Sequence, residues 1–384
     1  MRIKDIRLYP VSFPVKPEFI IQTTLGTHSS SHYVIVAVEC TDGTIGWGEA
    51  TVVPIWSGET QQSALTALHD IFTPVLRGRD PFDVERIMAE LDMVLVGNHF
   101  TKAAIEMALL DAITRHLQIP LYKYLGGQSN PVRFPIKFSI GTREPEDAAT
   151  IAYNKVQEGF TAIKVKVGTN LKKDLLRVRL VREAIGPDVL LNLDVNGGWA
   201  AKEAIKNIPL FTKFDIEYVE QPTPRSDILA LAEVRNNTPL PIMADESVFS
   251  VAHAYQVIRH AAADLISIYP GKNGGILKSK QICQMAAAAG ISCHIGSNLE
   301  WDISTAAMCQ LSVASSNIRI AEFPPDILGP LYYDTRLSTP VEFENGHVNL
   351  PPGNGLGLEI NEAEIEALSK LYSDATVLAT LNGK

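Results

Sequence analysis

Several features are scarce or missing in this sequence, and each absence excludes a class of protein. Cysteine occurs only four times in 384 residues. No two cysteines form a C-x-x-C pair, so neither a disulfide framework nor a cysteine-ligated zinc site is expected. No apolar run approaches the ~20 residues that cross a bilayer, and the N-terminus alternates charged and apolar residues instead of forming a signal sequence. We therefore expect a cytoplasmic protein without membrane contact.

Positive charge is also in short supply. The chain has 34 Lys and Arg against 43 Asp and Glu, which gives a formal net charge of −9. Without a basic run, it lacks the electrostatic footprint of a nucleic-acid-binding protein. An anionic small-molecule substrate would therefore need locally placed cations or a metal ion. The hydrophobic fraction of 46% is ordinary for a soluble globular chain and excludes intrinsic disorder.

The pattern of the chain changes near residue 131. Residues 1–130 contain three strand-like runs and then a helical stretch, which predicts an α+β domain. From residue 131 to 330, eight short apolar runs alternate with helical segments. This pattern predicts an α/β fold, a (β/α)7–8 TIM-type barrel. A doubly wound sheet fits less well because no Gly-rich phosphate loop follows the first strand. Residues 331–384 return to strand-like pieces and a final helix, and we expect them to complete the N-terminal domain.

Two lysines fall on the second predicted barrel strand. Lys164 and Lys166 alternate with apolar residues, so both lie on one face of the strand. We expect that face to point into the barrel, because the apolar residues between them suit the surrounding helices. Buried lysines are costly unless they have a function. The alternative is a shifted register that leaves both lysines in solvent.

Three carboxylates end the next three strands: Asp194, Glu220 and Asp245. Active-site groups of such barrels lie at the C-terminal ends of strands, where these acids would meet and repel one another. A divalent cation relieves that repulsion, and all-oxygen ligation favours Mg²⁺, with Mn²⁺ as a possible substitute. The alternative is that each acid caps the helix that follows it.

A lysine beside a metal and a second ammonium has a lowered pKa and can remove a proton α to a carboxylate.

These motifs resemble the enolase superfamily, in particular the muconate-lactonizing subgroup of the mandelate racemase/muconate lactonizing enzyme family. The resemblance implies that the N-terminal domain caps the barrel, and it implies homo-oligomers and a small carboxylate substrate. Lys166 would be the acid/base and Lys164 its neighbour at the substrate carboxylate. The resemblance further implies metal ligation by the three acids, support from Asn196 and Glu246 behind them, and closure of the loops around His28 and Trp56 over the substrate.

The sixth strand departs from the subgroup pattern. Tyr269 stands where a second catalytic lysine is usual, and Lys272 follows three residues later. Lys272 could turn into the site, or it could be a solvated loop charge, which we favour. Tyr269 could donate a proton, or simply pack at the rim. On the seventh strand, His294 is a candidate second base or a core histidine, and Glu300 is a candidate substrate contact.

With the second lysine replaced, chemistry that needs one base is favoured. We expect a Mg²⁺-dependent isomerase (cycloisomerase) or lyase (dehydratase) that works through an enediolate. One alternative is a racemase or epimerase whose second base is Lys272, Tyr269 or His294. Another is a non-catalytic acid-binding barrel, which would have no need of a base beside the metal.

Overall fold

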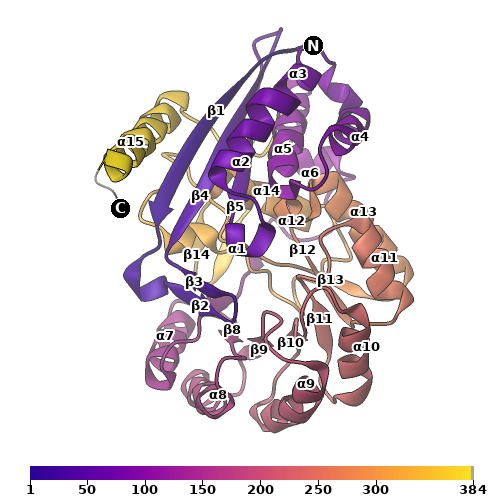
Figure 1. Cartoon of the computed structure of the whole chain (residues 1–384), viewed down its shortest axis with the longest axis vertical. Coiled ribbons are helices and arrows are strands. Elements are labelled where there is room, and N and C mark those ends of the chain that lie inside the picture. The colour runs from indigo at the N-terminus through magenta and orange to yellow at the C-terminus, as the bar shows by residue number, and fades with distance from the viewer. Residues whose placement is uncertain (382–384) are drawn as a thin grey trace.

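The computed structural model describes residues 1–381, with side chains described as far as residue 371. Its N-terminal part is an antiparallel sheet in the order β1-β4-β5 (Figure 1). These strands are β1 (Ile3–Pro14), β4 (Ser30–Cys40) and β5 (Ile45–Val52), and they confirm the three predicted strand runs. A small hairpin, β2 (Ile21–Thr23) and β3 (Gly26–His28), extends between β1 and β4.

The predicted helical stretch forms several short helices and one long helix. They are α1 (Pro54–Ser57), α2 (Gln61–Thr66), the π-helical turn η2 (Ala67–Phe72), α3 (Thr73–Leu76), α4 (Val84–Val94), α5 (His99–His116) and α6 (Leu121–Tyr124). Helix α5 lies against β5 at very close range. A Cβ at Gly48 would stand 1.9 Å from the carbonyl oxygen of Ala104. Only glycine on the strand and small residues on the helix permit this approach.

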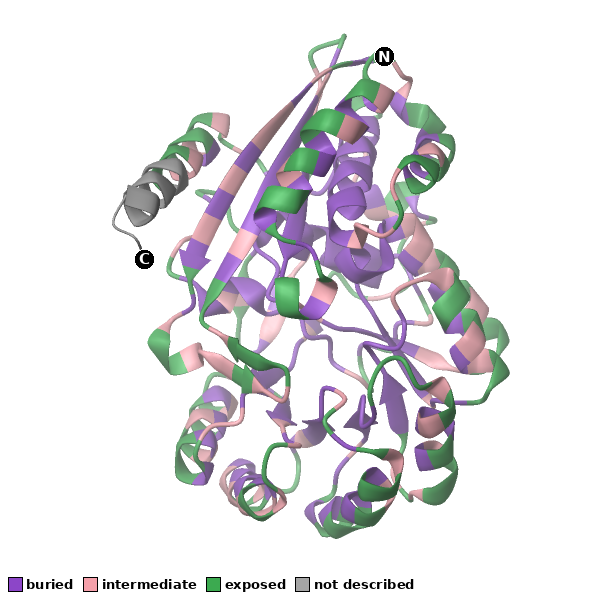
Figure 2. Ribbon diagram, in the orientation of Figure 1, coloured by how far each residue is buried: buried purple, intermediate pink, exposed green. Residues whose placement is uncertain are grey.

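The barrel is a curled parallel sheet of seven strands in chain order, β7 to β13 (Figure 1). The strands are β7 (Phe138–Ile140), β8 (Ala162–Lys166), β9 (Leu190–Asp194), β10 (Val219–Glu220), β11 (Ile242–Ala244), β12 (Leu265–Ile268) and β13 (Ser292–Ile295). The helices between and after them are α7 (Pro145–Gln157), α8 (Leu171–Ile185), α9 (Ala201–Asn207), α10 (Ile228–Asn237), α11 (Val251–Arg259), α12 (Pro270–Asn273), α13 (Ile276–Ala288) and α14 (Asp302–Val313). Figure 2 shows buried strands inside and helices with exposed outer faces. This architecture confirms the predicted barrel class.

Two predicted strands are absent from the described residues. The eighth apolar run, residues 318–324, makes a single bridge between Ile318 and Cys293 and then forms turns. Residues 331–338 begin within a 3-10 turn, η5 (Gly329–Tyr332), and continue without regular structure. In both segments, apolar side chains are buried by tertiary packing instead of by a strand ladder, a distinction that a short apolar run does not reveal.

The C-terminal segment contacts both parts of the molecule. Strands β14 (Phe343–Glu344) and β15 (His347–Asn349) pair with β6 (Arg133–Pro135), which precedes the barrel. Helix α15 (Glu362–Leu381) lies beside β1 (Figure 1), where Glu362 accepts a hydrogen bond from Arg7 at 2.5 Å. No helix among the described residues is long and apolar enough to cross a membrane.

Candidate active site

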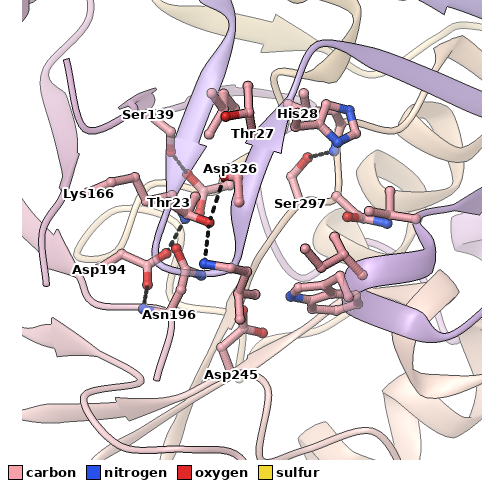
Figure 3. Close-up of a pocket in the computed structure, with 18 of the residues that line it drawn as sticks. Thr23, Thr27, His28, Ser139, Lys166, Asp194, Asn196, Asp245, Ser297 and Asp326 are labelled. Carbon is pink, nitrogen blue, oxygen red and sulfur yellow. Dashed lines mark hydrogen bonds and ion pairs between the residues drawn. The ribbon is translucent and has the colours of Figure 1, made fainter. Parts of the chain in front are cut away.

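A pocket of about 370 Å³ lies between the C-terminal ends of the barrel strands and two segments of the N-terminal domain. Residues 25–30 and 52–56 line it from the N-terminal side. Figure 3 shows Thr27 and His28 at the top of the site, with Asp194 and Asp245 below them. The site is therefore enclosed by residues far apart in the sequence, and the two loops around His28 and Trp56 do border it.

The three predicted acids converge on this pocket. Asp194 ends β9, Glu220 ends β10 and pairs with Asp194 across the ladder, and Asp245 follows β11. All three line the pocket, although their side chains are almost entirely buried. Burial raises the pKa of Glu220 to about 7, and the negative charges of Asp194 and Asp245 add to the rise against the opposing effect of Lys164. The acids thus repel one another as the sequence predicted.

Both predicted lysines point into the pocket from β8. The Nζ atom of Lys164 lies 2.9 Å from Glu220 Oε2 and 2.5 Å from Asp326 Oδ2. Against the effect of burial, these carboxylates raise the pKa of Lys164 well above its usual value, so it stays an ammonium. Lys166 forms an ion pair with Asp194 and is the more exposed of the two lysines. The inward register is therefore the one observed.

The donor set fits a hard divalent cation. In the described part of the chain, no three His, Cys, Asp or Glu groups already stand as a preformed ligand cluster. Instead, the ammonium groups of lysines form ion pairs with the carboxylates of Asp194, Glu220 and Asp245. Behind these acids, the buried oxygens Asn196 Oδ1 and Glu246 Oε2 have no hydrogen-bond partner among the described atoms. An all-oxygen cluster with mutual repulsion and unsatisfied oxygens suits Mg²⁺.

Residues behind the acids hold them in place. The backbone N–H of Asn196 donates to Asp194 Oδ1 at 2.9 Å, and its side-chain amide donates to Glu246 at 2.8 Å. Burial, together with the charges of Asp245 and Asp194, raises the pKa of Glu246 to about 8. Gln221 Oε1 accepts from the backbone N–H of Asp245 at 2.9 Å. Gln221 was not predicted, although its place directly after Glu220 could have indicated it.

Tyr269 and Lys272 differ sharply in position. Tyr269 lines the pocket, and its ring stacks on Trp56 with centroids 5.5 Å apart. Burial and the nearby carboxylates raise its pKa well above the usual value, so the phenol stays protonated. Lys272 is fully buried outside the pocket lining, and its Nζ lies 2.5 Å from Asp245 Oδ1 and 2.7 Å from the carbonyl of Ser267. The prediction of a solvated loop charge is wrong, because the short α12 turns Lys272 inward.

His294 and Glu300 do not line the pocket. His294 is fully buried on β13, with Nε2 4.0 Å from Asp326, and burial lowers its pKa well below the usual value. Glu300 accepts hydrogen bonds from Ser297 Oγ at 2.6 Å and from the backbone N–H of Asn298. In this geometry, a substrate in the pocket would not directly contact His294, Glu300 or Lys272.

Asp326 is the main site residue that the sequence analysis missed. It lines the pocket and contacts Lys164 at 2.5 Å and Ser139 Oγ at 3.1 Å. Lys137, fully buried beneath it, lies 3.7 Å from its carboxylate. Burial lowers the pKa of Lys137 to about 8. Asp326 lies just after the run taken as an eighth strand, so a search restricted to strand ends passed over it.

Comparison with known proteins matches both parts of the chain. Residues 147–364 match the family described as "Enolase C-terminal domain-like", and residues 5–126 match "Mandelate racemase / muconate lactonizing enzyme, N-terminal domain". The N-succinyl-L-Arg/Lys racemase of Bacillus cereus is 32% identical over 96% of this chain and 98% of its own length. Muconate cycloisomerase 1 of Rhodococcus opacus is 32% identical over 90% of this chain and 92% of its own length.

A solved structure also matches nearly the whole chain. The dipeptide epimerase of Enterococcus faecalis, in complex with Mg and the dipeptide L-Leu-L-Tyr, superposes with a TM-score of 0.88 at 33% identity. The superposition covers 93% of this chain and 99% of the epimerase.

Proposed function

Because the chain belongs to the mandelate racemase/muconate lactonizing enzyme family of the enolase superfamily, we propose that it is a Mg²⁺-dependent isomerase that acts at the α-carbon of a carboxylate. The observation that carries the proposal is the placement of Lys166 beside three converging carboxylates in one pocket. A non-catalytic barrel would have no use for a lysine in that position. The enzyme class itself is shared with relatives named as racemase, epimerase and cycloisomerase.

Each residue has a distinct task in the proposed reaction. Asp194, Glu220 and Asp245 would hold Mg²⁺, which supplies positive charge beside the substrate carboxylate as the α-proton leaves. Lys166 removes that proton on its own face of the substrate. Lys164, kept as an ammonium by Glu220 and Asp326, orients the carboxylate and offsets its charge.

Racemisation or epimerisation is the first candidate reaction. The relatives named above support it, and Tyr269 gives the site a proton donor across from Lys166. Lys166 extends from β8 and Tyr269 follows β12, with the three acid-bearing strands β9, β10 and β11 between them in the sheet. In this reaction Lys166 takes the α-proton and the Tyr269 hydroxyl returns one to the opposite face.

A cycloisomerisation on one face is the second candidate. It is favoured by the raised pKa of Tyr269, which makes the phenol a poor base for the reverse proton abstraction. Elimination of water, the lyase outcome of the sequence analysis, has no counterpart among the relatives reported above. Mn²⁺ likewise stays a prediction, whereas Mg is present in the Enterococcus faecalis epimerase complex.

Exchange in D₂O distinguishes the two candidates. The enzyme is incubated with Mg²⁺ and single enantiomers of candidate acids, and deuterium at the α-carbon is followed by NMR with chiral analysis. A racemase or epimerase, which moves protons on both faces of the α-carbon, forms the deuterated opposite enantiomer. Tyr269→Phe then abolishes that product, while exchange with retention persists. A one-face enzyme gives exchange with retention only. Absence of Mg²⁺-dependent α-exchange and of cyclised product across muconates, N-acyl amino acids, dipeptides and acid sugars would rule out the proposed isomerase.

A further inference from the structure

The pocket consists of two halves with different chemistry. The barrel half carries the three acids, Lys164, Lys166, Tyr269 and Asp326. We define the cap half as residues 21–32 and 52–56. It contains no Asp, Glu, Lys or Arg at all. Seven of its fourteen pocket-lining residues are apolar, among them Ile21, Leu25, Ile55 and Trp56, and the six polar ones are threonines, serines and histidines.

From this division, and resting on the proposed function, we infer that the substrate carries an uncharged substituent on its α-carbon, seated in the cap half. The barrel half takes the carboxylate and the α-carbon, since the lysines and acids lie there. The remainder of the substrate must then lie against the cap half, which closes the other side of the pocket.

The two histidines of the cap half do not supply a charge. Burial, and then the neighbouring His32, lower the pKa of His28 to about 4, and burial lowers the pKa of His32. Each ring also has a neutral partner: His28 Nε2 lies 2.6 Å from Ser31 Oγ, and His32 Nδ1 lies 2.8 Å from Ser12 Oγ. Both rings therefore act as neutral hydrogen-bonding groups near pH 7.

Charged residues close to the cap half are already engaged elsewhere. Arg225 does not line the pocket, and its guanidinium donates to the carbonyl of Trp56 at 2.8 Å. Asp326 lines the pocket but is neutralised by Lys164 and Lys137. A substituent bearing a carboxylate or an ammonium would therefore lose its hydration without gaining a partner, whereas an apolar substituent gains by leaving water.

A matched series of N-acetyl amino acids tests the inference by binding. N-acetyl-L-norleucine, N-acetyl-L-lysine, N-acetyl-L-glutamine and N-acetyl-L-glutamate share the carboxylate and the α-hydrogen but differ in side-chain charge or polarity. Dissociation constants are measured by calorimetry with Mg²⁺ at pH 7.5. We expect the norleucine compound to bind at least about tenfold tighter than the lysine and glutamate compounds, with glutamine between them. Equal or tighter binding of either charged compound overturns the inference, and so does failure of the whole series to bind.

Exchange of the α-hydrogen, measured on the same compounds, separates this inference from the proposed function. Selective binding of the norleucine compound without any α-exchange would count against racemisation of N-acyl amino acids but support the pocket assignment. Exchange of the glutamate or lysine compound at a kcat/KM equal to that of the norleucine compound would support the activity and refute the assignment.

A variant that places a charge in the cap half provides a second test. Leu25 lines the pocket and is 36% exposed, so Leu25→Arg should fold normally. We expect it to shift the ratio of affinities by about tenfold toward the glutamate compound. Leu229→Arg is the matched control, because Leu229 is exposed on α10 and lies outside the pocket lining. An unchanged ratio in Leu25→Arg would show that the substituent does not reach the cap half.

Discussion

Lys164 and Lys166 lie two residues apart on one strand, yet their surroundings give them different roles. Lys164 contacts the carboxylates of Glu220 and Asp326 closely and that of Asp194 at 3.6 Å. Among the described residues, Lys166 forms an ion pair with Asp194 only, and 12% of its side chain is exposed. A group that must give up and regain a proton needs such access, whereas a fixed ammonium does not.

Loss of Lys166 should therefore remove catalysis without removing the site. We expect Lys166→Ala to lower the rate of α-proton exchange by about 10²- to 10⁴-fold, the usual contribution of a general base. Magnesium binding, followed by calorimetry, should persist, because the three carboxylates remain. Retention of near-normal exchange would exclude Lys166 as the base.

Asp245 is expected to link metal binding to stability. Asp245→Asn should weaken Mg²⁺ binding by at least about 10²-fold, because it removes one of three anionic ligands. It should also lower the free energy of unfolding by about 1–3 kcal/mol, since the buried Lys272 loses its carboxylate partner. Titration calorimetry and denaturant unfolding measure the two effects. Asp70→Asn, at an exposed position on η2, is the control. Unchanged Mg²⁺ affinity in Asp245→Asn would remove Asp245 from the ligand set.

At the scale of elements, glutamates of the N-terminal domain accept hydrogen bonds at the starts of barrel helices. Glu49 on β5 accepts from the backbone N–H of Trp301 at 2.8 Å and of Ser304 at 3.0 Å, at the start of α14. Glu106 on α5 accepts from the N–H of Leu277 at 3.2 Å, in the first turn of α13. Helix N-termini favour negative charge, so these contacts join the two parts of the molecule.

The Glu106 contact predicts a pH dependence. Burial raises the pKa of Glu106 to about 7, above the unfolded value of 4.5. The contribution of the protonated Glu106 to the free energy of unfolding is fully present below pH 4.5. It is lost as the pH rises through 7, because the unfolded chain then releases the proton more readily. In Glu106→Gln, the free energy of unfolding should therefore fall less between pH 5 and 8, by at most about 3 kcal/mol. Unfolding at several pH values measures it, with exposed Glu85→Gln on α4 as control. Identical pH profiles for Glu106→Gln and the wild type would contradict the prediction.

At the scale of the whole molecule, the site exists only where the N-terminal domain meets the barrel. Trp56 belongs to α1 of the N-terminal part, yet its ring packs on Tyr269 and on Phe249, 4.9 Å away. Arg225, in the loop after β10, holds the carbonyl of Trp56. The barrel thus positions the segment that covers its own active site.

Arg225→Ala should loosen that cover. We expect KM to rise roughly fivefold, corresponding to the ~1 kcal/mol of one hydrogen bond, with kcat little changed. The fluorescence of Trp56, compared with that of a Trp56→Phe variant, should report greater solvent exposure. Arg319→Ala, which removes an exposed arginine paired with Glu322, serves as the control. A fall in kcat at constant KM would instead place Arg225 in the chemical step.

Local sequence patterns were enough to predict the barrel class and the convergence of the three acids. Both follow from local periodicity, because strand alternation directs Lys164 and Lys166 inward and parallel strands bring their C-terminal ends to one edge. The same local pattern failed at residues 318–324 and 331–338. There a short apolar run is buried by distant side chains, and its sequence does not distinguish such burial from a strand.

The surroundings of each side chain depend instead on tertiary contacts. The sequence predicts that Lys272 is a solvated charge in a loop, but the turn of α12 buries it against Asp245. Asp326 follows a segment without regular structure, so no periodicity places it beside Lys164. The neutral cap half comes from segments more than a hundred residues away from the lysines. Burial, ion pairing and enclosure depend on which distant segments meet, and that information is absent from any single stretch of the chain.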